Sequence, residues 1–361
     1  MNFELSDENR MLQDGLRRYL SDAYDPATRA EAAEAGFAPE VWSGLAEMGV
    51  IGALFAEEQG GFGGGGFDLA VVFEELGRAG AVDPLIDTGV LGGGLLVAFG
   101  ADIEDVIAGG AHLALAHGEP GSRYVLARVA TTAVRDGDGW TLSGRKSVVV
   151  NAPAAREVLV TARLSGDTAD RTGIALFRVA ADALSLRPYP LVGGGMASEI
   201  DLDGTPATLL AEDAFDAIAD VHARATLAIC AEALGLMEAI RALTVDYLRT
   251  RKQFGQPIGK FQVLQHRMAE MLIEIEQARS AVINLAGHID KPDRDRHVAA
   301  TKNLIGNVAR LVVEESIQMH GGIGMTEEYG LAHLARRLTM VDHRFGDALH
   351  HLDRFIELSA V

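Results

Sequence analysis

Two short stretches of the sequence carry residue types that suit the binding of a dinucleotide. In RKQFGQPIGKFQVLQHRMAEM, which begins at Arg251, the guanidinium offers a planar fork for a diphosphate, and Phe254 offers a ring face for a purine. In QMHGGIGMTEEYG, which begins at Gln318, the side-chain amide suits a base or a phosphate. Gly321 and Gly322 would let backbone N–H groups approach a ligand closely. A plainer interpretation stays open for both stretches, because each also resembles an ordinary helix end closed by glycine.

Two further patterns are better explained by structure than by chemistry. Gly61, Gly63 and Gly66 have the spacing of a dinucleotide-binding loop, but no strand precedes them and no β–α–β unit follows. We therefore predict a flexible glycine-rich loop. Cys230 lies in the apolar helical run TLAICAEALGLM, so we predict a packed core residue and not a nucleophile.

Three histidines lie near the end of the chain, at His343, His350 and His351. Their spacing does not bring three ligands together with a carboxylate, so we interpret them as part of a solvated helix face. The sequence analysis predicts no metal site.

Composition narrows the class of protein. The chain has 361 residues, a length that fits two or three subdomains. Apolar residues make up 48% of it, which is enough to form their interiors. A net charge of −19 argues against nucleic acid or an anionic membrane surface as the main partner. One cysteine excludes a disulfide scaffold and fits a reducing compartment, so we expect a cytoplasmic protein. The acidic start MNFELSDENR is not typical of a signal peptide, and no apolar run is long enough to predict a spanning helix.

The elements that must position the two stretches follow from hydrophobic periodicity. Residues 1 to about 110 indicate helices, with Ser6 as the N-cap of the first. From about 112 to 215, short runs rich in Val, Thr and Leu alternate with turns such as 136–139, which is typical of antiparallel strands. Helices return from about 218, including one at about 297–319. An apolar stripe on another helix is formed by Leu264, Met268, Met271, Ile275, Ala278, Val282 and Leu285.

Taken together, the two stretches and this order of elements resemble the acyl-CoA dehydrogenase family. EEQGGFGGGGF and GEPGS resemble weaker blocks of the same family, so the resemblance covers nearly the whole chain. It implies an α+β multidomain fold: an N-terminal all-α domain (1–111), a middle antiparallel β-barrel (112–216) and a C-terminal four-helix bundle (217–361). It also implies FAD, an acyl-CoA substrate, an electron-transfer flavoprotein and assembly as a dimer of dimers.

The resemblance also implies roles for single residues. In the family, residues matching Arg251, Phe254, Gln318, Gly321 and Gly322 reach across the dimer interface and hold the adenine and pyrophosphate end of the neighbour's FAD. The reaction is α,β-dehydrogenation, in which a carboxylate removes the α-proton and the β-hydrogen leaves as hydride to the flavin.

The chain departs from the family where the catalytic base belongs. The usual glutamate position falls on DHRFGDA, where Phe345 stands, and a phenyl ring cannot accept a proton. An alternative base position on the first helix of the bundle falls on Ala225. The remaining candidates, Glu232, Asp246 and Glu328, are better explained as ordinary helix or loop carboxylates.

The flavin-facing strand departs as well. KSVVVN has Val148 and Val150 where the family has a tryptophan and a flavin-binding threonine, and Gly118 replaces a threonine in GEPG. Residues that would serve the chain's own flavin are changed, whereas those that would serve a neighbour's FAD are kept.

This pattern of loss leads to the hypothesis of a non-basic subunit in a hetero-oligomeric acyl-CoA dehydrogenase. Such short subunits act in bacterial degradation of sterol side chains or dicarboxylyl-CoA. Three alternatives stay open: a homotetramer with a displaced base, a flavin-free structural partner, and a flavin monooxygenase on the same fold.

Overall fold

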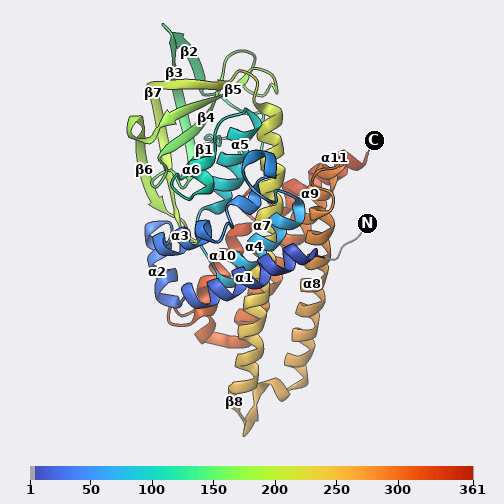
Figure 1. Ribbon diagram of the computed structural model, residues 1–361. Helices are drawn as coiled ribbons and strands as arrows, with labels where there is room; N and C mark the ends of the chain where they lie inside the picture. Colours follow the sequence, from blue (N-terminus) through green and yellow to red (C-terminus); the bar gives the residue numbers. More distant parts are fainter. Residues whose placement is uncertain (1–4, 361) are drawn as a thin grey trace. The chain divides into compact units, whose positions relative to one another are not determined.

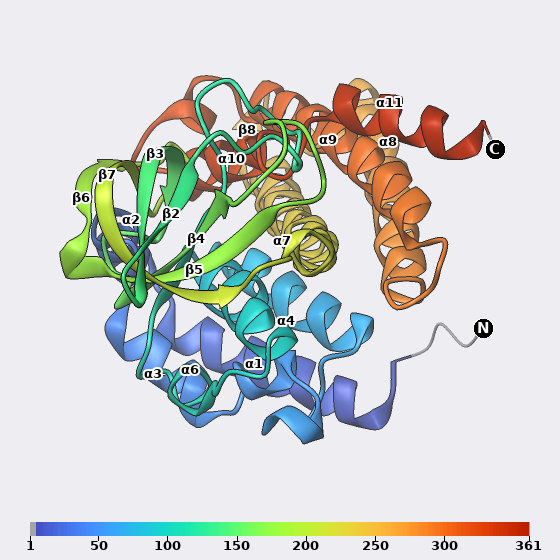
Figure 2. The same ribbon diagram turned by 90° about the horizontal axis from the view of Figure 1, so that it is seen from above.

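The computed structural model describes residues 5–360, which divide into two compact units. The helical unit holds the residues up to Arg29, Gly65–Ala81 and the residues from Thr226 onward. The sheet unit holds Ala30–Gly64 and Val82–Ala225. Figures 1 and 2 show the elements of both units, coloured along the sequence. No helix in the described part of the chain combines the length and the apolarity needed to cross a membrane.

The helical unit is built mainly from long helices. Its elements are α1 (Asp7–Ala23), α4 (Gly66–Ala79), α7 (Phe215–Thr250, from Thr226 onward), β8 (Lys252–Gln253), β9 (Gln256–Pro257), η5 (Ile258–Lys260), α8 (Gln262–Ala286), α9 (Arg294–His320), η6 (Gly321–Met325), α10 (Gly330–Val341) and α11 (Ala348–Ser359). These helices confirm the predicted C-terminal bundle.

The predicted apolar stripe lies on α8, where its members from Met268 to Leu285 are buried and Leu264 is half-buried. The helix predicted at about 297–319 is α9, which begins three residues earlier. At the start of the unit, the side chain of Ser6 accepts a hydrogen bond from the Asn9 backbone N–H (3.1 Å), which confirms the predicted N-cap of α1. Of the glycines predicted to form a flexible loop, Gly61 and Gly63 lie in the loop before α4, whereas Gly66 is the first residue of that helix.

The sheet unit combines short helices with seven strands. Its helices are α2 (Pro26–Ala35, from Ala30 onward), α3 (Pro39–Glu47), η1 (Gly52–Leu54), η2 (Glu57–Gln59), η3 (Ile86–Gly93), α5 (Gly94–Ala98), α6 (Glu104–Ile107), η4 (Ala181–Ala183) and the first turns of α7. Its strands are β1 (Leu113–Ala116), β2 (Thr132–Asp136), β3 (Gly139–Val150), β4 (Glu157–Arg163), β5 (Ile174–Ala180), β6 (Ser185–Pro190) and β7 (Met196–Ala211).

The strand pairings close into a ring in the order β4–β2–β3–β7–β5, with β5 paired again to β4. This confirms the predicted barrel, with one correction: β4 runs parallel to β1 and to β2, so the barrel is not wholly antiparallel. The connection from β1 to β4 contains the whole β2–β3 hairpin, and a connection of that length lets β4 return in the direction of β1. All of β4 after its first residue is buried, and Val158, Val160 and Ala162 belong to the apolar core of the barrel.

Candidate nucleotide-binding and active site

The chain turns back on itself directly after α7. The backbone N–H of Arg251 donates to the carbonyl of Tyr247 (2.9 Å), and β8 and β9 then pair as a two-stranded hairpin. Phe254 and Gly255 are the two central residues of its turn, with φ of 52° and 78°. Two successive left-handed residues are typical of a type I′ turn, which normally takes Asn-Gly or Gly-Gly. A phenylalanine in the first position is therefore strained.

The side chain of Phe254 projects into solvent. Phe254 is 91% exposed, and the ring nearest to it is Phe261, edge-on at 6.1 Å between centroids. Arg251 is also exposed, and its guanidinium forms no ion pair with any residue of the described chain. A cation and an aromatic ring held outward in this way suit a ligand that the chain itself does not supply.

The second stretch lies at the end of α9. Gln318 is exposed on its last turn, and Gly321 ends the helix with φ 67° and ψ −149°, a conformation open essentially to glycine alone. A Cβ added at Gly321 or at Gly322 would meet no atom within 4 Å. Packing within the chain therefore does not explain the bare backbone at Gly322, whereas a ligand that approaches from outside would explain it.

Three aromatic rings join the ends of α7 and α9. Tyr247 stacks on His320 with ring centroids 4.5 Å apart, and Tyr329 lies edge-on to Tyr247 at 6.3 Å. Tyr247 lies one helical turn before Arg251, and His320 directly precedes Gly321. The structure thus joins the end of α7, which leads into the first stretch, to the second stretch at the end of α9.

The hydrogen bonds of His320 fix its tautomer. Its Nδ1–H donates to the Ser316 carbonyl (2.7 Å), so Nε2 is left to accept from the Tyr329 hydroxyl (3.4 Å). Burial lowers the pKa of His320, which favours the neutral ring. The sequence analysis missed Tyr247, His320 and Tyr329. Two of them lie inside the quoted glycine-rich stretch, but the contact with Tyr247 spans more than 70 residues and has no sequence signal.

The position expected for the base is occupied by Phe345, in the loop between α10 and α11. Phe345 adopts φ 60°, its carbonyl accepts from His351 Nε2 (2.8 Å), and the Arg344 guanidinium lies 4.8 Å from its ring centroid. The two nearest carboxylates in sequence cap backbone groups: Asp342 accepts from the Ala348 N–H (3.0 Å) and Asp347 from the His350 N–H (2.8 Å). This loop therefore offers no free base.

Neither the second base position nor the remaining candidates supply a buried, available carboxylate. Ala225 is fully buried and has no polar side chain. Glu232 is buried, but its carboxylate accepts from the Arg337 guanidinium (2.7 Å). Asp246 and Glu328 are exposed to solvent, so neither is a carboxylate held inside a substrate pocket of this chain.

In the sheet unit, the two segments predicted to face a flavin lie side by side. The Ser147 N–H donates to the Gly118 carbonyl (2.8 Å), and buried Lys146 pairs with Glu119 (2.7 Å). Val148 is exposed and Val150 half-buried. Val148 and Val150 thus place aliphatic side chains where the family has an indole and a hydroxyl group, and Gly118 has no side chain. This face therefore lacks the groups that would contact a flavin.

Comparison with known proteins agrees with the architecture. The N-terminal, middle and C-terminal domains of acyl-CoA dehydrogenases match residues 6–103, 114–200 and 216–346. The chain is 28% identical over 375 residues to "Probable acyl-CoA dehydrogenase YngJ" of Bacillus subtilis, covering 99% of this chain and 98% of the relative. It is 29% identical over 353 residues to "Acyl-CoA dehydrogenase FadE12" of Mycobacterium tuberculosis, covering 92% and 90%.

Among solved structures, the "Tcur3481-Tcur3483 steroid ACAD G363A variant" superimposes with a TM-score of 0.87 at 30% identity, over 98% of both chains. Matches in all three domains and over almost the full length leave one assignment. The chain belongs to the acyl-CoA dehydrogenase family, a family of FAD-dependent oxidoreductases.

Proposed function

We propose that this chain is the non-basic subunit of a hetero-oligomeric acyl-CoA dehydrogenase and that it completes the FAD site of a homologous, base-bearing subunit. The observation that carries the proposal is a contrast within one chain. Arg251 is exposed and forms no ion pair within residues 5–360, and Phe254 beside it faces outward, whereas Phe345 stands where the family has its glutamate. We therefore infer that Arg251 and Phe254 form a nucleotide clamp, and that none of the candidate carboxylates in the described chain serves as the proton acceptor for a substrate of its own.

In this arrangement each residue has a limited role. Arg251 would hold the pyrophosphate of the partner's FAD with a charge-assisted hydrogen bond, and Phe254 would cover the adenine. Gln318 and the backbone at Gly321 and Gly322 would bind the same end of the cofactor. When bound, the flavin supplies hydride acceptance. The base that takes the α-proton from the acyl-CoA would belong to the partner.

Two observations favour a hetero-oligomer over a homotetramer with a displaced base. The carboxylates nearest in sequence to Phe345 already cap backbone groups, and Glu232 is paired with Arg337. In addition, the 30% identical solved structure is named for two proteins and described as a "steroid ACAD". By similarity, we propose a sterol-derived or related bulky acyl-CoA thioester as the substrate class and an electron-transfer flavoprotein as the acceptor.

The first experiment compares the chain purified alone with the chain co-expressed with its base-bearing homologue. We expect the lone chain to be flavin-poor and inactive, and the complex to be yellow and to reduce its flavin with acyl-CoA under anaerobic conditions. Full flavin content and turnover by the lone chain would overturn the proposal.

The second experiment tests the clamp inside the complex. Arg251→Ala should weaken FAD binding by about 10- to 100-fold, because a hydrogen bond to a charged group contributes about 1.5–3 kcal/mol. Arg249→Ala is the matched control, since Arg249 is an exposed arginine in the last turn of α7, two residues before Arg251. Equal FAD loss from both variants would show that only general positive charge matters.

A further inference from the structure

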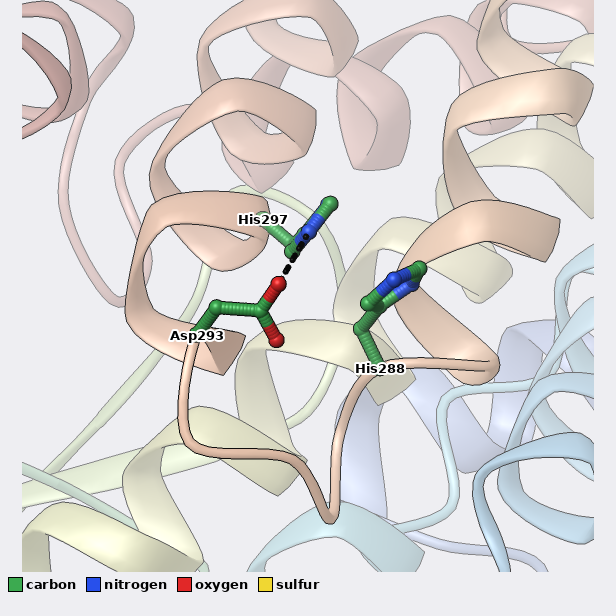
Figure 3. A group of neighbouring side chains, drawn as sticks. All are labelled: His288, Asp293 and His297. Atoms are coloured by element: carbon green, nitrogen blue, oxygen red, sulfur yellow. Dashed lines mark hydrogen bonds and ion pairs between the residues drawn. The ribbon is translucent and has the colours of Figure 1, made fainter. Parts of the chain in front are cut away.

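The turn that joins α8 to α9 gathers two imidazoles and a carboxylate (Figure 3). His288 follows the end of α8, Asp293 directly precedes α9, and His297 lies one helical turn later on the same side as Asp293. One ligand atom from each of the three residues lies within 4.8 Å of the other two. We refer to these three residues as the His–Asp–His cluster.

Two nitrogens and one oxygen form a ligand set suited to a borderline divalent transition-metal ion. Zn²⁺ binds imidazole nitrogen and carboxylate oxygen at about 2.0–2.2 Å, and sites with three protein ligands leave a fourth position for water. In a tetrahedral site those bond lengths separate the ligand atoms by about 3.3 Å. Ligand atoms that lie up to 4.8 Å apart therefore have to approach one another by as much as about 1.5 Å to enclose the ion.

One neighbouring residue orients both rings. Nδ1–H of His288 donates to the backbone carbonyl of Asn284 (2.8 Å), which leaves Nε2 of that ring with its lone pair free for a metal. The side-chain amide nitrogen Nδ2 of the same Asn284 lies 2.8 Å from Nδ1 of His297, so it donates to Nδ1, and Nε2–H of His297 donates to Asp293 Oδ2 (3.3 Å). A flip of the Asn284 amide would place its oxygen against Nδ1–H of His297 and free the Nε2 lone pair for a metal, on the side of Asp293.

The two imidazole rings of the cluster are stacked on one another. The rings of His288 and His297 are nearly parallel, at 21°, with centroids 3.8 Å apart. A metal must lie close to both ring planes, so one ring has to rotate about its side-chain bonds. His288 lies outside the helix and is only half-buried, and the Asp293 side chain is 57% exposed, so both have room to move.

We propose that His288, Asp293 and His297 form a binding site for a divalent transition-metal ion such as Zn²⁺, with Asn284 as the positioning residue. The bound ion would tie the end of α8 to the start of α9. The proposal is independent of the nucleotide clamp, because it uses none of the clamp residues.

The test uses the full chain, purified without a histidine tag and stripped with a chelator. Titration with Zn²⁺ should give one site per chain, and Co²⁺ should give the visible absorption bands of a nitrogen and oxygen ligand set. His297→Ala and Asp293→Asn should each weaken binding at least 10-fold. His343→Ala, at an exposed histidine of the same unit, should bind Zn²⁺ like the wild type.

Substitutions of Asn284 test whether its contacts to the two histidines contribute to metal binding. Asn284→Asp keeps an acceptor for Nδ1–H of His297 and should retain or strengthen Zn²⁺ binding, whereas Asn284→Leu should weaken it by about 10- to 100-fold. Circular dichroism should show unchanged helix content in every variant compared. The proposal is overturned if the wild type binds no Zn²⁺, if His343→Ala weakens binding as much as His297→Ala, or if Asn284→Leu binds as tightly as the wild type.

Discussion

At the scale of single residues, Val148 is held in a conformation that its own chemistry disfavours. It has φ 53° at a register shift between β3 and β7, although β-branched residues rarely adopt positive φ. Glu199 holds this bulge in place, because its carboxylate accepts from the Val148 N–H (3.1 Å), the Ser147 hydroxyl (2.9 Å) and the Tyr189 hydroxyl (3.1 Å). The strain is therefore maintained by neighbouring contacts.

Val148→Asn should raise the free energy of unfolding by about 1 kcal/mol, because asparagine tolerates the left-handed region and Val148 is already 56% exposed. Asn151 adopts φ 64° three residues later in the same chain. Val134→Asn is the control: Val134 is 62% exposed on β2 without a positive φ, so the change should give no gain. Urea unfolding measures both. A loss of stability in Val148→Asn would contradict this account of the bulge.

His351 makes the loop around Phe345 sensitive to acid. The ring is buried with 6% of its surface exposed, and Nε2–H donates to the Phe345 carbonyl while Nδ1 has no hydrogen-bond partner in the described structure. Burial lowers the pKa of His351 to about 4, and nearby Lys302 acts in the same direction. The unfolded chain takes up this proton near pH 6.5 and the folded chain only near pH 4, so stability falls as the pH drops through that window.

A pKa that falls from 6.5 to about 4 corresponds to at most about 3 kcal/mol of stability lost by pH 4. His351→Gln keeps a donor to the Phe345 carbonyl and removes the titration. The unfolding free energy of this variant should therefore fall less steeply between pH 6.5 and 4. His343→Gln, at an exposed histidine, should follow the wild type. His117, whose pKa burial also lowers to about 4, leaves a residual slope in every variant. Parallel curves for His351→Gln and the wild type would contradict the assignment.

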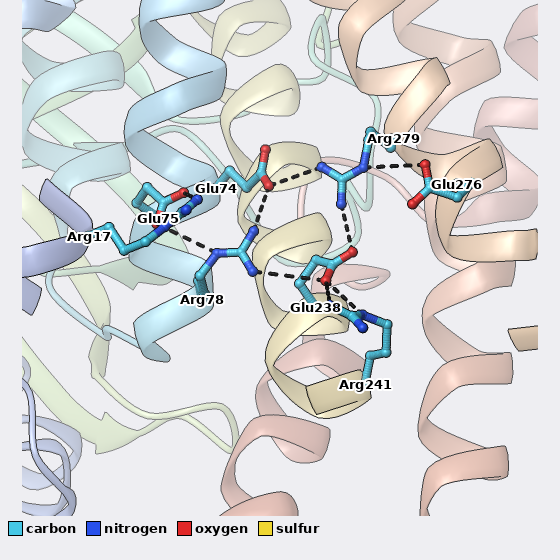
Figure 4. Close-up of polar contacts among 8 residues, drawn as sticks. All are labelled: Arg17, Glu74, Glu75, Arg78, Glu238, Arg241, Glu276 and Arg279. Atoms are coloured by element: carbon cyan, nitrogen blue, oxygen red, sulfur yellow. Dashed lines mark hydrogen bonds and ion pairs between the residues drawn. The ribbon is translucent and has the colours of Figure 1, made fainter. Parts of the chain in front are cut away.

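At the scale of elements, a network of arginines and glutamates links four helices of the helical unit (Figure 4). Arg17 comes from α1, Glu74, Glu75 and Arg78 from α4, Glu238 and Arg241 from α7, and Glu276 and Arg279 from α8. The four positive and four negative side chains balance. Arg279 bridges three of the helices, because it binds Glu74 (3.2 Å) on α4 and Glu238 (2.6 Å) on α7.

Arg279→Met should lower the free energy of unfolding by about 3–5 kcal/mol, because it leaves the largely buried Glu74 and Glu238 carboxylates with one cation fewer. Glu276 is the third partner of Arg279, at 3.5 Å, and the Glu276 side chain is 65% exposed. Glu276→Gln should therefore lower the free energy of unfolding by less than about 1 kcal/mol. Thermal and urea unfolding provide the comparison. Similar losses in both variants would show that exposure does not govern the strength of these pairs.

The elements also show what sequence patterns can and cannot predict. The stripe on α8 and the N-cap at Ser6 were predictable because each depends on residues within a few turns of one another. The parallel pairing of β1 with β4 depends on about 40 intervening residues and was not predictable. The clamp residues were identified by resemblance, and their individual roles stay predictions. The His–Asp–His cluster was missed because its members flank a polar turn without a standard ligand spacing.

At the scale of the whole molecule, the proposed division of labour fixes the cofactor content of the assembly. A complete FAD site needs a nucleotide clamp from one chain and a flavin-facing strand with a base from another. In our proposal this chain contributes the clamp through Arg251 and Phe254, whereas its own strand carries Val148 and Val150 and its base position carries Phe345. Only the sites formed on the partner's strand would then be complete, and these are half of all sites in an assembly with equal numbers of the two chains.

We therefore expect the purified complex to contain about one FAD per two chains, where a homotetramer with four working sites would contain about one per chain. Flavin absorbance after denaturation, set against protein mass from amino-acid analysis, measures the ratio. Phe345→Glu provides the matched test, because it restores a carboxylate to a site that is proposed to hold no flavin. It should change neither the FAD ratio nor the turnover of the complex. A ratio near one FAD per chain, or added turnover from Phe345→Glu, would mean that this subunit runs the reaction in its own site.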